Sequence, residues 1–499
     1  MKTSWNLNLL YKSATDPLIE KDITIYEKAC AAFEKKYKKD TSYLEHDSKL
    51  LKALKEYEQF YAMPGAAKAY AYFHYRQDLK SSDQEAEQNL NQLRQRLAKA
   101  GNKLVFFEIS IGKISAAHQK EILKDKNFAH FKYFLERLFV TAKHDLTEAE
   151  EKIMNLKSLP ARSMWTQGQE KLLNQQQVTF KGKTMPIPEA FNMMSELPTK
   201  DRRALNDAIN EVLKSISYFA ESEINAIYTD KKINDELRGF KFPYSNTILG
   251  YQNDEKSIIN FVNTVTEHFK ISHRFYKLKA KLLKENKLEY ADRAAKIGDI
   301  SVKLSFNDSL KLLGSAFEKV NPAYKEILDR YMEQGQIDVF PAQGKGGGAY
   351  CSSNIGLPTF VKLNHVDNLK SFKTFAHEMG HAIHAEFSKS QPPLYEGHTI
   401  SVAEVASTLF ENFGFEAVFE QLSEKEKIIA LHDKINDTIS TIFRQIAGFN
   451  FELELHNTLR AQGALSKEQI ANLHNKHMKS YLGPVFNMKE LDGYFFVQW

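Results

Sequence analysis

The spacing of apolar residues along the chain predicts helices over most of its length. From about residue 17 to 173, apolar positions recur every three or four residues among many Lys, Glu and Gln, which is the pattern of amphipathic helices. The same pattern resumes at 199–288, with one long amphipathic stretch at 258–283, and again at 307–334. The sequence therefore predicts a mostly α-helical protein.

Pro and Gly are scarce until residues 180–188, where F-K-G-K-T-M-P-I-P predicts a short turn or hairpin followed by a break. We place a boundary just after it. The predicted division is an N-terminal helical lobe at 1–195 and a second lobe at 196–499.

Composition changes again at 339–364, which holds five Gly and two Pro and ends in a short alternating strand at 359–364. If that strand is isolated, its unpaired edge can hold an extended peptide by strand addition. Two helices are expected next, at about 369–387 and 401–420, and further helix follows to about residue 482.

The composition is that of a globular protein, with 42% hydrophobic and 26% charged residues, and its 34 Phe and 22 Tyr point to an aromatic core. The 68 basic and 63 acidic residues are spread along the chain, so nucleic-acid binding is not expected. No signal peptide or membrane span is expected, and no obligate protein partner is inferred. Only Cys30 and Cys351 are present, which favours a reducing compartment and hence the cytoplasm.

The strongest chemical signal is His377-Glu378-x-x-His381 inside a predicted helix. A spacing of four places the two imidazoles about 40° apart around a helix that turns about 100° per residue, so both can bind one metal ion. Glu378 flanks that face, where a carboxylate can take a proton from water without itself binding the metal. The pattern predicts a zinc site.

A third ligand must come from elsewhere, because the extended metzincin pattern requires His where this chain has Phe387. Glu404, 23 residues past His381 at the start of the next predicted helix, is the first candidate. Spacing alone leaves an alternative open, since Ser401-x-x-Glu404 is also a capping box. Glu396, in the preceding loop, is the fallback ligand.

Glu411 falls seven residues after Glu404 on the same helix face, where it can accept the free N–H of a ligating histidine. A solvated helix charge is the alternative, and it is the simpler explanation. His384 shares the face of His377 and His381 but lies a turn too far to share the ion, so contact with substrate or simple packing is expected.

The glycine-rich loop at 344–350 lacks the spacing of a phosphate-binding loop. Gly347 and Gly348 give the backbone freedom, which favours a mobile flap over a cleft, while a plain surface loop is the alternative. Tyr350 is a candidate donor to the substrate oxygen.

These residues resemble the oligoendopeptidase F group of the thimet oligopeptidase family. The resemblance is carried by G-G-G-A-Y at 346–350, F-V-K-L-N at 360–364, F-A-H-E-M-G-H-A-I-H at 375–384 and A-E-V-A-S at 403–407. It extends to W-N-L-N-L-L-Y at 5–11, I-F-R-Q at 442–445 and F-E at 451–452, so it covers nearly the whole chain.

The resemblance implies an elongated, two-lobed helical zincin with a deep central channel and one small β-sheet near the zinc site. It implies one Zn²⁺ held by His377, His381 and Glu404, in a metalloendopeptidase of the gluzincin type with Glu378 as general base. It also implies that the substrates are short unfolded oligopeptides, since a narrow channel excludes folded proteins.

Family members continue past the position that matches Trp499 into a segment whose His and Tyr residues donate hydrogen bonds to the substrate carbonyl. This sequence ends at Trp499 after an apolar run, so we expect it to be truncated at its C-terminus. The alternative function is therefore a catalytically impaired, zinc-containing peptide-binding homologue. A helical scaffold with an accidental H-E-x-x-H is the other rival.

Overall fold

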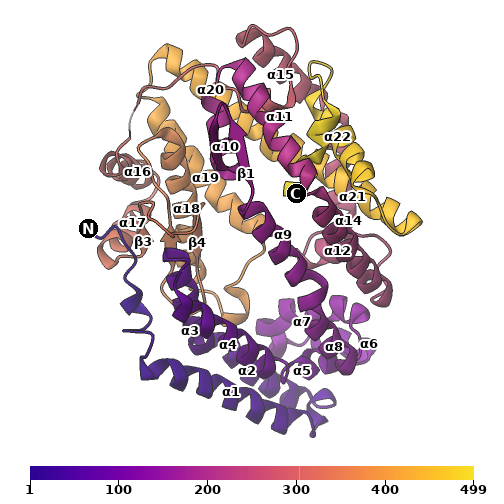
Figure 1. Cartoon of the computed structure of the whole chain (residues 1–499). Helices are drawn as coiled ribbons and strands as arrows, with labels where there is room; N and C mark the ends of the chain where they lie inside the picture. The colour runs from indigo at the N-terminus through magenta and orange to yellow at the C-terminus, as the bar shows by residue number, and fades with distance from the viewer. Residues whose placement is uncertain (303) are drawn as a thin grey trace. The chain divides into compact units, whose positions relative to one another are not determined.

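The computed structural model describes residues 1–302 and 304–499, and most of them lie in helices (Figure 1). The predicted predominance of helix is confirmed. Contacts divide the chain into two compact units, each built from two separate segments. Unit 1 comprises Met1–Glu148 and Val302–Leu422, and unit 2 comprises Ala149–Ser301 and Ser423–Trp499.

Unit 1 contains both helices of the predicted metal site. Its elements are α1 Pro17–Tyr37, α2 Asp47–Ala62, α3 Pro64–Leu79, α4 Gln84–Gly101, α5 Val105–Gly112, α6 Ala116–Ile122, α7 Lys132–Thr141, α16 Phe306–Val320, α17 Pro322–Gln334, β3 Ile337–Asp338, β4 Tyr350–Ser352, β5 Phe360–Lys362, α18 Leu369–Ser388 and α19 Ile400–Phe419.

Unit 2 is helical apart from one hairpin. Its elements are α8 Glu148–Ser158, which begins at the last residue of unit 1, α9 Met164–Asn174, β1 Gln177–Phe180, β2 Lys183–Pro186, α10 Ile187–Met193, α11 Thr199–Ser215, α12 Ser217–Leu237, α13 Ser245–Gly250, α14 Glu255–Glu267, α15 Lys270–Leu282, α20 Glu424–Ile439, α21 Gln445–Gln462 and α22 Lys467–Leu482.

The two units differ from the lobes drawn at residue 195, because the chain leaves unit 1 near residue 148, returns near 302 and leaves again near 422. A single boundary in the sequence cannot separate two units that are each built from two segments. The division into lobes at residue 195 stays a prediction. Within the described residues, no helix is both long enough and apolar enough to cross a bilayer.

Two stretches of helical pattern each contain two helices. The stretch at 258–283 forms α14 and α15; His268 is the C-cap residue of α14, and its ring donates a hydrogen bond of 2.7 Å to the carbonyl of Thr264. The stretch at 307–334 breaks at Asn321, whose side chain caps α17 ahead of Pro322.

The hairpin expected at 180–188 is confirmed as β1 and β2, which pair antiparallel. Its turn residues, Lys181 and Gly182, both have positive φ, as a two-residue hairpin turn of type I′ requires.

The strand expected at 359–364 is neither isolated nor at an edge. It forms β5, the centre of a three-stranded sheet in the order β3-β5-β4. Phe360 and Val361 are fully buried, and the indole of Trp5 donates to the carbonyl of Val361 at 2.8 Å. The edge next to α18 belongs to β4 instead, so this is the strand that an extended peptide can join.

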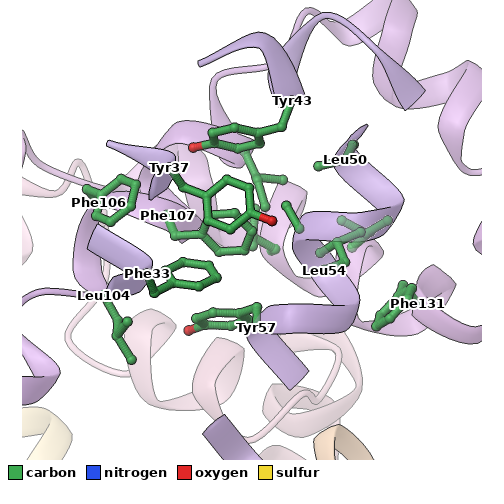
Figure 2. Close-up of a cluster of buried hydrophobic side chains, with 14 of the residues drawn as sticks. Phe33, Tyr37, Tyr43, Leu50, Leu54, Tyr57, Leu104, Phe106, Phe107 and Phe131 are labelled. Carbon is green, nitrogen blue, oxygen red and sulfur yellow. The ribbon is translucent and has the colours of Figure 1, made fainter. Parts of the chain in front are cut away.

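A cluster of aromatic side chains in unit 1 surrounds Phe107 of α5 (Figure 2). Its ring lies 4.8 Å from that of Tyr57, 5.0 Å from that of Phe33 and 5.4 Å from that of Tyr43, measured between centroids. Phe107 is fully buried. The expected aromatic core is therefore present, and it joins α1, α2 and α5.

Truncating this central ring tests how much the cluster stabilises unit 1. Phe107→Ala leaves a cavity among the rings and is expected to lower the free energy of unfolding by about 3–5 kcal/mol, read as a lower thermal midpoint by circular dichroism. Phe261→Ala, on the exposed face of α14, is the control and should stay within about 0.5 kcal/mol. Equal effects of the two variants contradict the packing argument.

Candidate metal centre

Helices α18 and α19 pack unusually closely, and glycine makes this possible. A Cβ added at Gly380 of α18 would lie 2.8 Å from the Cα of Ser407 and 3.0 Å from the carbonyl oxygen of Ala406, both in α19. A Cβ at Gly414 of α19 would lie 2.9 Å from the Cβ of Ala376 in α18. The backbones therefore approach to a distance that no larger residue permits at these two positions.

This close contact brings the three predicted ligands together. One donor atom from each of His377, His381 and Glu404 lies within 4.8 Å of the others. Nε2 of His377 lies 3.4 Å from Oε2 of Glu404, and Nε2 of His381 lies 3.7 Å from Oε1 of Glu404. Ligands at about 2.1 Å from a tetrahedral zinc are about 3.4 Å apart, so these three residues fit the ion.

The capping-box explanation for Glu404 is wrong. Helix α19 begins at Ile400 with Thr399 as its N-cap residue, so Ser401 already lies inside the helix. The carboxylate of Glu404 instead accepts a hydrogen bond of 2.7 Å from the hydroxyl of buried Ser407, which holds it toward the histidines. Glu396 is not among the three grouped donors of the described residues.

Glu411 lies where it can orient His377. Its carboxylate is 3.4 Å from Nδ1 of His377, the nitrogen that does not face Glu404, and 3.1 Å from Nζ of Lys373. The Glu411 carboxylate raises the pKa of His377, although burial opposes this. Burial alone would raise the pKa of Glu411, but the contacts with His377 and Lys373 lower it.

Glu378 is buried beside this cluster with only 6% of its surface exposed. Burial raises its pKa to about 7; the charge of His377 opposes the shift, the charge of Glu404 adds to it, and the backbone N–H of Cys351 in β4 opposes it by hydrogen bonding. A carboxyl group with a pKa near neutrality can both accept and release a proton. Glu378 thus lies between the histidines and the edge strand.

His384 lies outside the group of three donors and stacks on His398 instead, with ring centroids 4.2 Å apart. Burial lowers the pKa of His384, and the neighbouring imidazole of His398 lowers it further. Burial also lowers the pKa of His381; the Glu404 carboxylate opposes this shift, and the neighbouring imidazoles add to it. Both rings therefore favour the neutral form. A role for His384 in contact with substrate stays a prediction.

The glycine-rich loop is tied down rather than free. The side chain of Asn364 donates to the carbonyls of Gly346 and Gly348 at 2.9 Å and 2.8 Å, and the amide of Gly346 donates to the carbonyl of Asp78 at 2.8 Å. Gly348 uses its freedom to adopt a φ of 70°, whereas nothing crowds Gly347. These contacts argue against a mobile flap.

The hydroxyl of Tyr350 donates to the carboxylate of Asp78, and Nζ of Lys362 lies 4.7 Å from the centre of its ring. The same hydroxyl is therefore already engaged, which removes the main argument for Tyr350 as a donor to the substrate oxygen.

Several residues of the site were missed from the sequence. Gly380, Ser407, Lys373 and His398 had no assigned role. A signal existed for the first two, because Ala376 and Gly380 lie four residues apart on α18, and Ser407 and Gly414 lie seven apart on α19. Small residues at these spacings predict a close helix pair. No comparable spacing marks Lys373 or His398.

The site can now be compared with known proteins. A family model described as peptidase family M3 matches residues 191–497, more than half of the chain. The chain belongs to peptidase family M3. A second family model, described as oligopeptidase F, matches residues 111–173 of the same chain.

Curated relatives agree with the resemblance to oligoendopeptidase F. An oligoendopeptidase F homologue of Lactococcus lactis is 24% identical over 96% of this chain and 80% of its own length. The group B oligopeptidase PepB of Streptococcus agalactiae is 23% identical over 77% of this chain. The aligned region spans 66% of PepB, so the chain matches about two thirds of that relative.

Solved structures show the same fold. The crystal structure of an oligoendopeptidase F from Enterococcus faecium aligns with 96% of this chain and 82% of its own, with a TM-score of 0.67 and 16% sequence identity. The expected helical architecture of this family is therefore confirmed, and the small sheet beside the metal centre is present in unit 1.

The contact at Gly380 can be tested by adding one carbon. Gly380→Ala places a Cβ against the backbone of α19, so we expect a loss of about 1–3 kcal/mol in the free energy of unfolding and weaker zinc binding. Gly101→Ala, at the end of α4 with nothing within 4 Å, is the matched control and should be neutral. Thermal unfolding and zinc titration measure both effects. Unchanged zinc affinity in Gly380→Ala contradicts the role of the close contact.

Proposed function

We propose that this chain is a zinc metalloendopeptidase that hydrolyses short unfolded oligopeptides, with one zinc ion held by His377, His381 and Glu404. The observation that carries the proposal is the convergence of these three donors within 4.8 Å, next to the buried carboxylate of Glu378. Membership of family M3 and relatives named oligopeptidases support the reaction class and the substrate class.

A zinc ion in this position supplies Lewis acidity, which polarises a carbonyl group and acidifies water. Glu378 of the chain itself moves the proton. Its carboxylate takes a proton from the attacking water and passes it to the leaving amine nitrogen.

Glu411 acts as a positioning residue in this proposal. By accepting the Nδ1–H of His377 it fixes the tautomer in which Nε2 is free to bind the metal. Lys373 in turn holds Glu411. The chain of contacts from Lys373 to His377 therefore orients one ligand without touching the substrate.

We place the reaction in the cytoplasm, because Cys30 and Cys351 are both free thiols, as suits a reducing compartment.

Metal analysis and one substitution test the proposal together. We expect one zinc per chain in the wild type and in Glu378→Gln, and loss of zinc in His377→Ala and His381→Ala. Glu378→Gln should cleave a quenched fluorescent peptide about 10²–10⁴ times more slowly, because it lacks the base. Glu416→Gln, exposed on α19, is the control and should match the wild type.

Zinc binding with full peptide cleavage in Glu378→Gln contradicts its role as base. Zinc and peptide binding without turnover in the wild type is the result expected of the catalytically impaired alternative. A wild type without zinc overturns the metal centre altogether.

The variant Glu411→Gln distinguishes an effect on the orientation of His377 from an effect on the stability of the fold. We expect zinc affinity to fall about 10–100-fold, measured by competition with a chromophoric chelator, because the His377 ring loses its charged acceptor. Cleavage should recover when zinc is added in excess, and the thermal midpoint of the metal-free protein should not change. Glu420→Gln, at the end of α19, should leave zinc affinity unchanged. A loss of activity that excess zinc does not restore contradicts the positioning role.

A further inference from the structure

A cavity of about 560 Å³ lies in unit 1 beside the metal centre, within the range of roughly 300–1,000 Å³ that ligand sites occupy. One wall, from α1, α2, α3 and the residue that joins the last two, is formed by Tyr26, Phe60, Tyr61, Met63, Ala66 and Ala67. The other wall comes from residues 353–355 and 396–398. We call this space the aromatic cavity.

Two connections place the aromatic cavity next to the reacting centre. Residues 353–355 directly follow β4, and Cys351 of β4 gives its backbone N–H to Glu378. His398 stacks on His384, which follows His381 by three residues on α18. The cavity therefore adjoins both the edge strand and the helix of the metal ligands.

The edge strand β4 determines how a bound peptide lies relative to the aromatic cavity. A peptide that pairs with β4 is extended, and its alternate side chains point to the same side. Because the cavity begins where β4 ends, a side chain of such a peptide lies at the cavity mouth. The occupant of the cavity is then a side chain, while β4 holds the backbone.

The lining decides which side chain fits. Tyr26 and Phe60 pack edge to face with ring centroids 6.5 Å apart, and the short side chains of Ala66 and Ala67 leave room beside them. Among the described residues of the lining, Glu396 is the acidic one, and it lies on the wall opposite the three helices. The lining favours an apolar side chain over a charged one.

We propose that the aromatic cavity is a specificity pocket that takes a large apolar or aromatic side chain of an oligopeptide paired with β4. This inference rests on the proposed function, since it places a peptide along that strand. It adds what the function leaves open, which is the kind of residue that the chain prefers near the cut bond.

The test uses eight-residue quenched fluorescent peptides in which one Phe is moved through an Ala-rich sequence, with cut sites read by mass spectrometry. At one position relative to the cut bond, Phe should raise kcat/KM of the zinc-loaded protein roughly 10–100-fold over Ala. Lys at that position should give no such gain. A larger gain with Lys than with Phe overturns the proposal.

Two variants then link this preference to the cavity. Tyr61→Ala removes part of the cavity wall; Tyr61 is 39% exposed. Ala67→Leu fills part of the cavity. In both, the ratio of kcat/KM for the Phe peptide to that for the Ala peptide should fall at least about fivefold. Tyr251→Ala, on an exposed tyrosine of unit 2, should keep the wild-type ratio. An unchanged ratio in both cavity variants overturns the proposal, and thermal unfolding confirms that each variant is folded.

Failure of the proposed function would look different, because zinc-loaded wild type would then cleave no peptide at all. In that case fluorescence anisotropy of labelled Phe and Ala peptides tests the cavity alone. Tighter binding of the Phe peptide, lost in Tyr61→Ala and Ala67→Leu, supports the specificity pocket. Equal binding of the two peptides overturns it.

Discussion

The close contact between α18 and α19 is the constraint on which the rest of the site depends. His377, Glu378 and His381 lie on one helix and Glu404 and Glu411 on the other, so every distance between these two groups is set by how near the two backbones come. Gly380 and Gly414 set that approach, because each faces the other helix at a point where a Cβ has no room. The packing of the two backbones thus sets how near Glu404 and Glu411 come to the histidines.

The same contact concentrates charge. Three carboxylates, those of Glu378, Glu404 and Glu411, share the neighbourhood of His377 and His381, and like charges so close together repel one another without a compensating cation. Lys373 compensates the charge of Glu411, because its Nζ lies 3.1 Å from that carboxylate. In the proposed metal centre, a divalent cation held by His377, His381 and Glu404 would compensate these carboxylates on the side of the imidazoles.

The sheet contributes on the other side of Glu378. Because β5 is central and anchored through Trp5, β4 forms the edge of the sheet, and the N–H of Cys351 in β4 reaches the Glu378 carboxylate. The aromatic cavity begins where that edge ends. Proton transfer, backbone pairing and side-chain selection can therefore take place along one short stretch of strand in unit 1.

Much of this protein follows from its sequence alone. The periodicity of apolar residues predicts the helices, including those at about 369–387 and 401–420, because helix period is a local property. The spacing of His377 and His381 fixes them on one face for the same reason. Tertiary structure was needed where residues far apart in the chain meet. It ruled out a capping box for Glu404, which depends on where α19 begins, and it brought that carboxylate next to His377 and His381.

The tertiary structure also decided which strand is the edge, since the order β3-β5-β4 joins segments that the sequence shows only in succession. It showed that Tyr350 is engaged by Asp78, 272 residues away, and that the chain passes more than once between two units. Local pattern determines what each segment becomes and which residue types are available for chemistry. Long-range packing determines which of them meet, because contact between distant segments depends on the shape of both surfaces and not on the spacing within either one.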